Sequence, residues 1–467
     1  MDTRLDDSPW RRIHTTIALA LGVGWMLDAF EVQIIGSVIP GLQAEFGLDG
    51  AQSVWINVIW FVGVALGALG FGFLADRFGR RRLFVATLLM YSVAAILTAT
   101  AQDYGSFVFF RFVTALGVGG EYSAVSSAIS EFMPARSRGR SNGLVMTFWA
   151  VGGILASVVS IVVISTLDLS WRYTLLFGVV SAGYGLMARR LIPESPRWLA
   201  SRGRFAEADR VIERISGIAS SSDRADRSQP SQTFRDSVRE VWSQHRPTVL
   251  FGMALDFSEA AGYYGLFTAM SVFVFSSATG RVPIGDGVLP FYYLIANVGA
   301  LAGGIAVSYA LDIVGRRPTV TISYTLAAIS MLGCAWAAST GSATDVLVAF
   351  TVAAFFATCA WVSAYPTIAE LFPTHLRATG FGMSVGVGRT GAIVGQVILA
   401  AVATSFSPVS VFVLLGAFWL IGTVAGLAWW RRGVEATGVA LDALSHGRPA
   451  LPDRLDPVPV GVDRTRI

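Results

Sequence analysis

Apolar runs of about 20 residues recur along most of this chain and are separated by short polar segments. A transmembrane helix needs about 20 consecutive apolar residues, and these runs lack the strict alternation of a membrane β-barrel. The pattern therefore predicts an all-α membrane protein. Twelve transmembrane helices are expected, near residues 13–40, 54–74, 83–100, 107–132, 143–166, 173–192, 248–275, 289–310, 319–339, 344–372, 380–403 and 409–430.

Two polar segments occur twice, once in each half of the chain. Residues 72–83 read Gly-Phe-Leu-Ala-Asp-Arg-Phe-Gly-Arg-Arg-Arg-Leu, and residues 310–317 repeat the pattern as Ala-Leu-Asp-Ile-Val-Gly-Arg-Arg. Glu131-Phe-Met-Pro-Ala-Arg-Ser-Arg138 likewise aligns without gaps with Glu370-Leu-Phe-Pro-Thr-His-Leu-Arg377. Duplicated halves are typical of transporters. The repeats therefore predict two pseudo-symmetric six-helix bundles.

Charged residues make up 14% of the chain and lie mainly between the apolar runs. All 35 basic residues are arginine, and 31 of them lie in the tails and in the loops on one side; the opposite loops hold only Arg172 and Arg281. Basic loops stay in the cytoplasm. We therefore expect an inner-membrane protein with both termini cytoplasmic. Because the arginines flank apolar helices, their number does not indicate binding to nucleic acid.

The longest polar stretch separates the two halves. Apolar residues recur in it at helical spacing, which predicts an amphipathic helix on the cytoplasmic face; they are Phe205, Ala208, Val211, Ile212 and Ile215. Four parts follow: an N-terminal six-helix bundle, a cytoplasmic linker with this helix, a C-terminal six-helix bundle and a cytoplasmic tail, at residues 1–192, 193–246, 247–432 and 433–467.

Several motifs point to a known family. They are the turn at 72–83, the arginine and glycines Arg111, Gly117, Gly119 and Gly120, and the segment 193–199, Pro-Glu-Ser-Pro-Arg-Trp-Leu. Over about residues 13–442 the chain resembles the major facilitator superfamily, and its sugar-porter-like branch in particular. Residues 435–438 resemble the tail motif of that branch, with Val434 in place of its proline. The resemblance implies the twelve-helix major facilitator fold and a transport function.

A finer resemblance concerns the substrate. Asp28-Ala-Phe-Glu31 resembles the paired-acid signature of the aromatic acid:proton symporters, from which Ala29 and Glu31 depart. Segments 117–121, 365–370 and 388–395 resemble those of aromatic-acid, niacin and organic-ion transporters. Residues 256–265 lack the glutamines of the seventh helix of sugar carriers, which disfavours a sugar. The chain is most similar to the aromatic acid and metabolite:proton symporters.

Four ionisable residues are expected inside the first bundle: Asp28, Glu31, Arg111 and Glu121. A charge at the bilayer centre costs about 2.5–3.5 kcal/mol on insertion scales, so such residues are functional candidates. Asp28 and Glu31 share a helix face, and the sugar-porter resemblance implies that an acid here pairs with Arg111. We hypothesise that Asp28 or Glu31 carries a proton, that Arg111 modulates it, and that these three side chains surround a shared central void. A static ion pair is the alternative, and Glu121 either carries a proton or holds its helix against a neighbour.

A second group of candidates lies in the second bundle, on spans that the fold implies face a cavity. Arg389 is expected to bind a substrate carboxylate bidentately, or else to form a salt bridge between helices. Asp256 is placed nearer the cytoplasmic mouth as a solvated acid, and Glu259 deeper as a cavity residue. The predicted substrate-binding residues are Glu259, Tyr263, Tyr264, Trp361, Tyr365 and Arg389.

The repeated polar turns are gate elements by family resemblance. Their arginines are expected to reach helix ends and acids when the cytoplasmic side closes. Some of these arginines serve only to orient the helices in the membrane. The predicted gating residues are Asp76, Arg80, Glu131, Asp312, Arg316, Glu370 and Arg377.

These observations predict a secondary active transporter rather than an enzyme. It imports a small organic acid, with an aromatic acid favoured, together with protons; the alternatives are an organic cation or a sugar-like solute, or a sensor that does not transport. No phosphate-binding loop indicates ATP as the energy source, and Cys334 and Cys359 lack metal-ligand spacing. We expect no cofactor besides the proton gradient, no metal, and a monomer in the lipid bilayer.

Overall fold

The computed structural model describes residues 4–6, 8–48, 50–218, 233–270, 289–403, 407–437 and 439, and within these ranges the regular secondary structure is helical. The Arg281 loop and most of the predicted C-terminal tail lie outside the described residues. The first half contains α1 (Arg12–Gln33), α2 (Ile35–Phe46), α3 (Gly50–Phe78), α4 (Arg80–Ala99), α5 (Tyr104–Phe132), η1 (Ala135–Ser137), α6 (Arg138–Ser160), η2 (Ile161–Thr166), α7 (Arg172–Leu175) and α8 (Gly178–Leu191).

The second half repeats this arrangement. It contains α12 (Arg246–Ala269), α13 (Leu289–Ile313), α14 (Arg316–Thr340), α15 (Ala343–Glu370), α16 (Arg377–Gly388), α17 (Thr390–Ala403) and α18 (Pro408–Arg432). Three shorter helices lie between the halves: α9 (Pro196–Ser201), α10 (Phe205–Ser216) and α11 (Phe234–Gln244).

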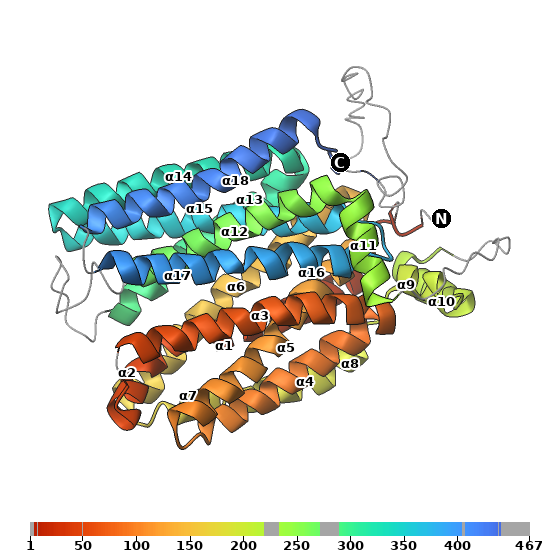
Figure 1. The fold of residues 1–467 in the computed structure, drawn as a ribbon. Helices are drawn as coiled ribbons and strands as arrows, with labels where there is room; N and C mark the ends of the chain where they lie inside the picture. The colour runs from red at the N-terminus through yellow and green to blue at the C-terminus, as the bar shows by residue number, and fades with distance from the viewer. Residues whose placement is uncertain are drawn as a thin grey trace, which may run out of the picture.

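Nine helical segments of the described chain are long and apolar enough to cross a membrane. The other three expected crossings are α5 and α12, which carry ionisable residues, and the short pair α7–α8. The first crossing passes from α1 to α2 at Ile34, the sixth is divided into α7 and α8, and the eleventh passes from α16 to α17 at Arg389. The predicted all-α fold class, twelve crossings in two bundles, is confirmed (Figure 1).

The two bundles meet mainly along two helix pairs, α3 with α16 and α6 with α13, with smaller contacts of α5 and α6 to α15. Small residues allow the close approach of α6 and α13, because a Cβ added at Gly143 would lie 2.5 Å from Ser308 Oγ and one at Gly304 would lie 2.5 Å from Thr147 Oγ1. Glycine at such contacts lets helices pack tightly in lipid, where there is no hydrophobic drive between them.

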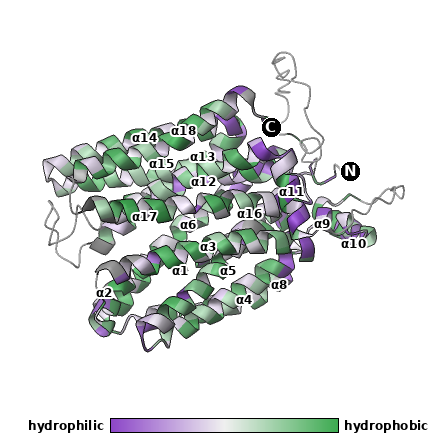
Figure 2. Ribbon diagram, viewed as in Figure 1, coloured by the Kyte–Doolittle hydropathy of each residue, from purple (hydrophilic) through white to green (hydrophobic). Residues whose placement is uncertain are grey.

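Polar residues are concentrated at one end of the molecule, near α9, α10 and α11 (Figure 2). We call this the arginine-rich end; it includes the α3–α4, α5–α6, α13–α14 and α15–α16 connections. The amphipathic α10 coincides with the helical spacing seen at 205–215, and it buries Ala208, Ile212 and Ile215. The helix α11 was not predicted. It packs on α12 and α16 through a buried Val241.

Candidate functional site

A small cavity lies between the two bundles and is lined mostly by aromatic side chains. Its volume is about 10 Å³, close to the lower limit for one water molecule. The lining residues are Trp25 on α1, Tyr122 on α5, Trp149 on α6, Glu259, Tyr263 and Tyr264 on α12, Trp361 and Tyr365 on α15, and Arg389 at the α16–α17 junction. The structure thus brings together all six of the residues expected to bind substrate. Their role in binding remains a prediction.

Sequence reasoning missed the aromatic residues that the first bundle contributes. Trp25 and Tyr122 meet at 4.7 Å between ring centroids, and Trp149 and Trp361 at 5.9 Å across the bundle interface. Tyr122 follows Glu121 directly, and Trp25 lies one helical turn before Asp28. Proximity to buried acids was therefore the available signal. Hydropathy alone does not distinguish an aromatic that faces a cavity from one that faces lipid.

Arg389 is surrounded by partners. Its Nη2 lies 3.5 Å from Asp256 Oδ1, and its Nη1 lies 3.4 Å from Glu259 Oε2. Tyr365 accepts a hydrogen bond from Arg389 and donates one of 3.1 Å to Asp256. The guanidinium also lies over the Tyr122 ring, 5.0 Å from its centroid. The expected alternative of a salt bridge between helices is therefore the arrangement present in this structure.

Asp256 corrects one prediction. It is buried and ion-paired, not a solvated acid near the mouth. The reason is packing: α15, α16, α17 and α18 surround α12. Gly388 permits the approach, since a Cβ there would lie 2.4 Å from Asp256 Cβ. Asp256 therefore belongs to the Arg389 group, which we define as Asp256, Glu259, Tyr365 and Arg389.

The hydrogen-bonding capacity of this group is only partly used. Among the described residues, Arg389 Nε and Nη1, Asp256 Oδ2 and Glu259 Oε2 are buried and make no hydrogen bond. Buried polar atoms are normally hydrogen-bonded, and exceptions suggest a function. Here the unbonded atoms belong to side chains in or beside the cavity, so they are able to interact with a ligand.

The ionisable residues of the first bundle form a separate group. Arg111 Nη1 lies 3.6 Å from Glu31 Oε2, and Arg111 Nη2 donates a hydrogen bond of 3.1 Å to the Glu31 carbonyl. Arg111 also lies over the Trp60 ring at 3.9 Å. Asp28 faces Glu121 on α5 and Tyr91 on α4. We define Asp28, Glu31, Arg111 and Glu121 as the Arg111 group.

The expected contact between Arg111 and an acid of the first span is present for Glu31. The Arg111 group is buried, as expected, but its members are not among the residues that line the cavity. Trp25 and Tyr122, from the same two helices, line the cavity instead. The expectation that Asp28, Glu31 and Arg111 surround the central void was therefore wrong in this respect.

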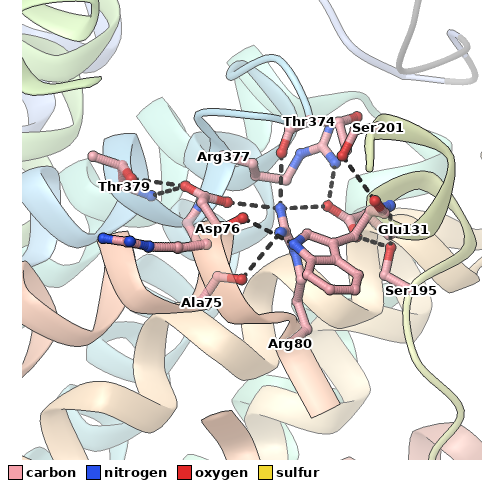
Figure 3. Close-up of polar contacts among 12 residues, drawn as sticks. Ala75, Asp76, Arg80, Glu131, Ser195, Ser201, Thr374, Arg377 and Thr379 are labelled. Carbon is pink, nitrogen blue, oxygen red and sulfur yellow. Dashed lines mark hydrogen bonds and ion pairs between the residues drawn. The ribbon is translucent and has the colours of Figure 1, made fainter. Parts of the chain in front are cut away.

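An ion-pair cluster joins the two bundles at the arginine-rich end (Figure 3). Arg80 pairs with Asp76 at 2.7 Å and with Glu131 at 3.1 Å, all in the first bundle. Arg377 of the second bundle pairs with Glu131 at 2.9 Å. Thr379 donates its backbone N–H to Asp76 Oδ2 at 2.7 Å. We call this set the first gate cluster.

The second gate cluster is its repeat. Arg316 pairs with Asp312 at 3.0 Å and with Glu370 at 3.2 Å. The Arg140 backbone N–H donates to Asp312 Oδ2 at 3.0 Å, which connects this cluster to the first bundle. The structure therefore gathers all seven predicted gating residues into two clusters. Their role in gating remains a prediction.

The N-terminal segment takes part in the second connection. Arg138, the repeat partner of Arg377, pairs with Asp6 and donates a hydrogen bond of 3.1 Å to the Val439 carbonyl. Asp6 also binds Arg197 at 2.7 Å and is buried. From the sequence this segment was identifiable only as a short polar tail, and its burial was not predicted.

A further repeat appears at the starts of α4 and α14. Glu194 accepts the Arg81 backbone N–H at 3.2 Å, and Glu435 accepts the Arg316 N–H at 2.9 Å. The preceding glycines have φ values of 103° and 102°, a region that favours glycine. Partial burial acts to raise the pKa of Glu435, but hydrogen bonds from Thr437 and the backbone outweigh it and lower that pKa. The tail motif therefore functions as a helix cap despite Val434.

Metal binding finds no support in the part of the chain that the structure describes, where no group of three or more His, Cys, Asp or Glu side chains is arranged to hold an ion. Cys334 and Cys359 are both buried and free.

Comparisons with known proteins identify the family. The family described as "Sugar (and other) transporter" matches residues 22–429. The niacin transporter NiaP of Acinetobacter baylyi is 31% identical over 85% of this chain and 89% of its own, and the putative niacin/nicotinamide transporter NiaP of Bacillus subtilis is 29% identical over 82% and 87%. The solved structure of the proton:xylose symporter XylE has the same fold, with a TM-score of 0.77 at 20% identity over 93% of this chain and 98% of XylE. The chain therefore belongs to the sugar (and other) transporter family of the major facilitator superfamily, and it is a multi-pass membrane transporter rather than an enzyme.

Proposed function

We propose that this transporter carries a small organic acid, with an aromatic acid favoured, across the inner membrane together with protons. The observation that carries the proposal is the position of Arg389 in an aromatic cavity between the bundles. A guanidinium binds a carboxylate through two parallel hydrogen bonds, and aromatic side chains stack on a planar ring. The similarity to a niacin transporter supports the choice, because niacin is a pyridine carboxylic acid.

Transport by this protein requires the cavity to open and close. At about 10 Å³ the cavity is too small for an aromatic ring, so substrate entry needs its walls to separate. The duplicated bundles, residues 1–192 and 247–432, would rock about the site as in other transporters with this kind of repeat. By the positive-inside rule, the arginine-rich end, the 193–246 linker and both termini face the cytoplasm. The two gate clusters would then close the cytoplasmic side.

Proton coupling is assigned to the Arg111 group. Three carboxyl groups and one guanidinium are enclosed together in the first bundle. A buried carboxyl beside another acid retains a proton more readily, and an approaching arginine favours its release. Movement of Arg111 relative to Glu31 and Asp28 during rocking would load and release a proton. A static ion pair would predict no change in coupling when the acids are neutralised.

Reconstituted protein tests this function. Counterflow of labelled nicotinate and benzoate in proteoliposomes should be detectable, and proton uptake should accompany it. Arg389→Gln should abolish carboxylate counterflow, whereas the matched substitution Arg140→Gln, which leaves the backbone contact to Asp312 in place, should retain it. Absence of counterflow with every carboxylate would contradict the substrate class, and absence of counterflow with every solute would leave a sensor as the alternative. Full proton coupling in both Asp28→Asn and Glu31→Gln would contradict the assignment to those two acids.

An organic cation is the second candidate, and one observation favours it. Two carboxylates face a single guanidinium at the cavity, and aromatic walls attract cations through their ring faces. The same assays separate the candidates. Counterflow of amines without counterflow of carboxylates would reverse the substrate assignment.

A further inference from the structure

We infer that Asp256 and Glu259 occupy the position of the substrate carboxylate on Arg389, and that the substrate displaces them with the uptake of one proton at this acid pair. This inference rests on the proposed function and deepens it. It adds a second site of proton coupling, in the second bundle, to the Arg111 group of the first.

The geometry supports substitution of one carboxylate by another. Asp256 and Glu259 lie three residues apart on α12 and approach different nitrogens of the same guanidinium, at 3.5 and 3.4 Å. Both distances are long for charge-assisted hydrogen bonds, which are typically about 2.7–2.9 Å. The two acids therefore hold Arg389 loosely in the cavity. An incoming carboxylate that forms two short hydrogen bonds to it is able to compete.

The charges that face this acid pair are unbalanced. Among the described residues, the titratable groups besides Arg389 that interact with this pair are tyrosines, neutral at physiological pH: Tyr122 on α5, Tyr263 and Tyr264 on α12, Tyr324 on α14 and Tyr365 on α15. Two ionised carboxylates against one guanidinium would leave a net negative charge inside the membrane. Since unbalanced buried charge is costly, the pair should share one proton at rest.

Substrate binding then changes the proton count by one. At rest the group holds one guanidinium, one carboxylate and one carboxylic acid, and its net charge is zero. When a monocarboxylate takes Arg389, the displaced carboxylate faces no cation. It takes one proton from solution, which leaves one guanidinium, one substrate carboxylate and two carboxylic acids, and the net charge is again zero. Release of substrate and proton reverses the step.

The inference distinguishes single from double substitutions. With Glu259→Gln or Asp256→Asn, the remaining acid pairs with Arg389 at rest and still takes up one proton when displaced. With both substitutions no acid is left to take it up. A purely structural role for these acids would not make either one sufficient for proton uptake.

The experiment measures proton uptake when nicotinate binds to purified protein in weakly buffered detergent solution. We expect each single variant to match the wild type and Asp256→Asn/Glu259→Gln to take up one proton fewer. Because the double variant takes up one proton fewer, its Kd for nicotinate should also change about tenfold less per pH unit than that of the wild type. The control pair Glu207→Gln/Glu213→Gln, two exposed acids on α10 outside both groups, should match the wild type.

A second measurement needs no substitution and guards against misfolding of the double variant. Nicotinamide has no carboxylate. At saturation, its binding to the wild type should therefore be accompanied by the uptake of one proton fewer than the binding of nicotinate. Equal uptake by the double variant and the wild type, or by the two ligands, would overturn the inference. Failure of the wild type to bind any carboxylate would instead refute the proposed function, and the two failures are therefore distinguishable.

Discussion

The two gate clusters occupy equivalent positions in the repeat, yet they connect the bundles differently. In the first cluster, Glu131 binds an arginine from each bundle, Arg80 at 3.1 Å and Arg377 at 2.9 Å. In the second, Glu370 binds Arg316 of its own bundle, and Arg138 pairs with the N-terminal Asp6 instead. Duplication has kept the residue types but changed the partner of this arginine. In the first cluster, Glu131 therefore carries the ion pair between the bundles, beside the hydrogen bonds from Thr379 to Asp76. In the second, Arg138 is held by Asp6 and reaches the second half of the chain through the Val439 carbonyl.

This asymmetry predicts that Glu131→Gln has the largest effect. Arg80 would keep Asp76 at 2.7 Å, but Arg377 would lose its carboxylate partner, and breaking a buried pair in this way costs about 3–5 kcal/mol. Glu370→Gln should cost less, about 1.5–3 kcal/mol, because Glu370 pairs with Arg316 alone, and Arg316 keeps Asp312 at 3.0 Å. Thermal unfolding of the purified variants checks the order.

Opening of the arginine-rich end gives a second way to compare the Glu131→Gln and Glu370→Gln variants. Ala378 is buried beside Asp76, and the two native cysteines are buried as well. A maleimide should therefore label Ala378→Cys slowly in the parent, fastest with Glu131→Gln and at an intermediate rate with Glu370→Gln. Glu213→Gln, at an exposed position on α10, is the control and should change nothing. Equal effects of Glu131→Gln and Glu370→Gln would show that the clusters are equivalent.

Asp6→Asn should have a smaller effect although Asp6 is buried, about 1 kcal/mol, the lower end of the cost of removing a partner from a buried polar group. The N-terminal segment can move away and let water reach Arg138 and Arg197, so neither arginine would stay buried without a partner. Arg138 also has Glu370 nearby, and that acid is its expected partner once Asp6 is neutral. The labelling rate of Ala378→Cys should therefore rise more in Asp6→Asn/Glu370→Gln than the two single variants predict together. Strict additivity would contradict this exchange of partners.

The sequence predicted the fold and the gate residues because both depend on patterns that survive in one dimension. Apolar runs give the crossings, and the repeated acids and arginines give the clusters. It did not predict that Asp6 lies beside Arg138, because a short polar segment without periodicity carries no information about its contacts. The burial of Asp256 was missed because depth was counted along α12, whereas the break between α16 and α17 at Arg389 decides what covers it.

The cavity shows the same limit. Glu259 and Arg389 were identifiable as charges within apolar runs. Trp25 had only its position one helical turn before Asp28 as a signal and Trp149 had none, because a tryptophan satisfies the hydropathy pattern equally well against lipid, against a helix or against a cavity. Only the packing of α1 and α6 against the second bundle assigns them to the site. The sequence alone therefore does not predict the contacts between elements that lie far apart along the chain.

The smallest predicted effect on stability concerns the helix caps, where Glu435 at the start of α14 repeats Glu194 at the start of α4. Glu435 accepts backbone N–H groups at the start of α14, so Glu435→Gln should cost about 1 kcal/mol, the usual effect of losing a cap. Because its pKa is lowered in the folded protein, this stabilisation is present above the ordinary value of 4.5 and is lost as the pH falls through the folded value. The difference in thermal stability between the parent and Glu435→Gln should therefore be full at pH 7 and shrink once the pH falls below 4.5. A difference that persists unchanged in acid would mean that Glu435 acts through its shape or neutral hydrogen bonds rather than its charge.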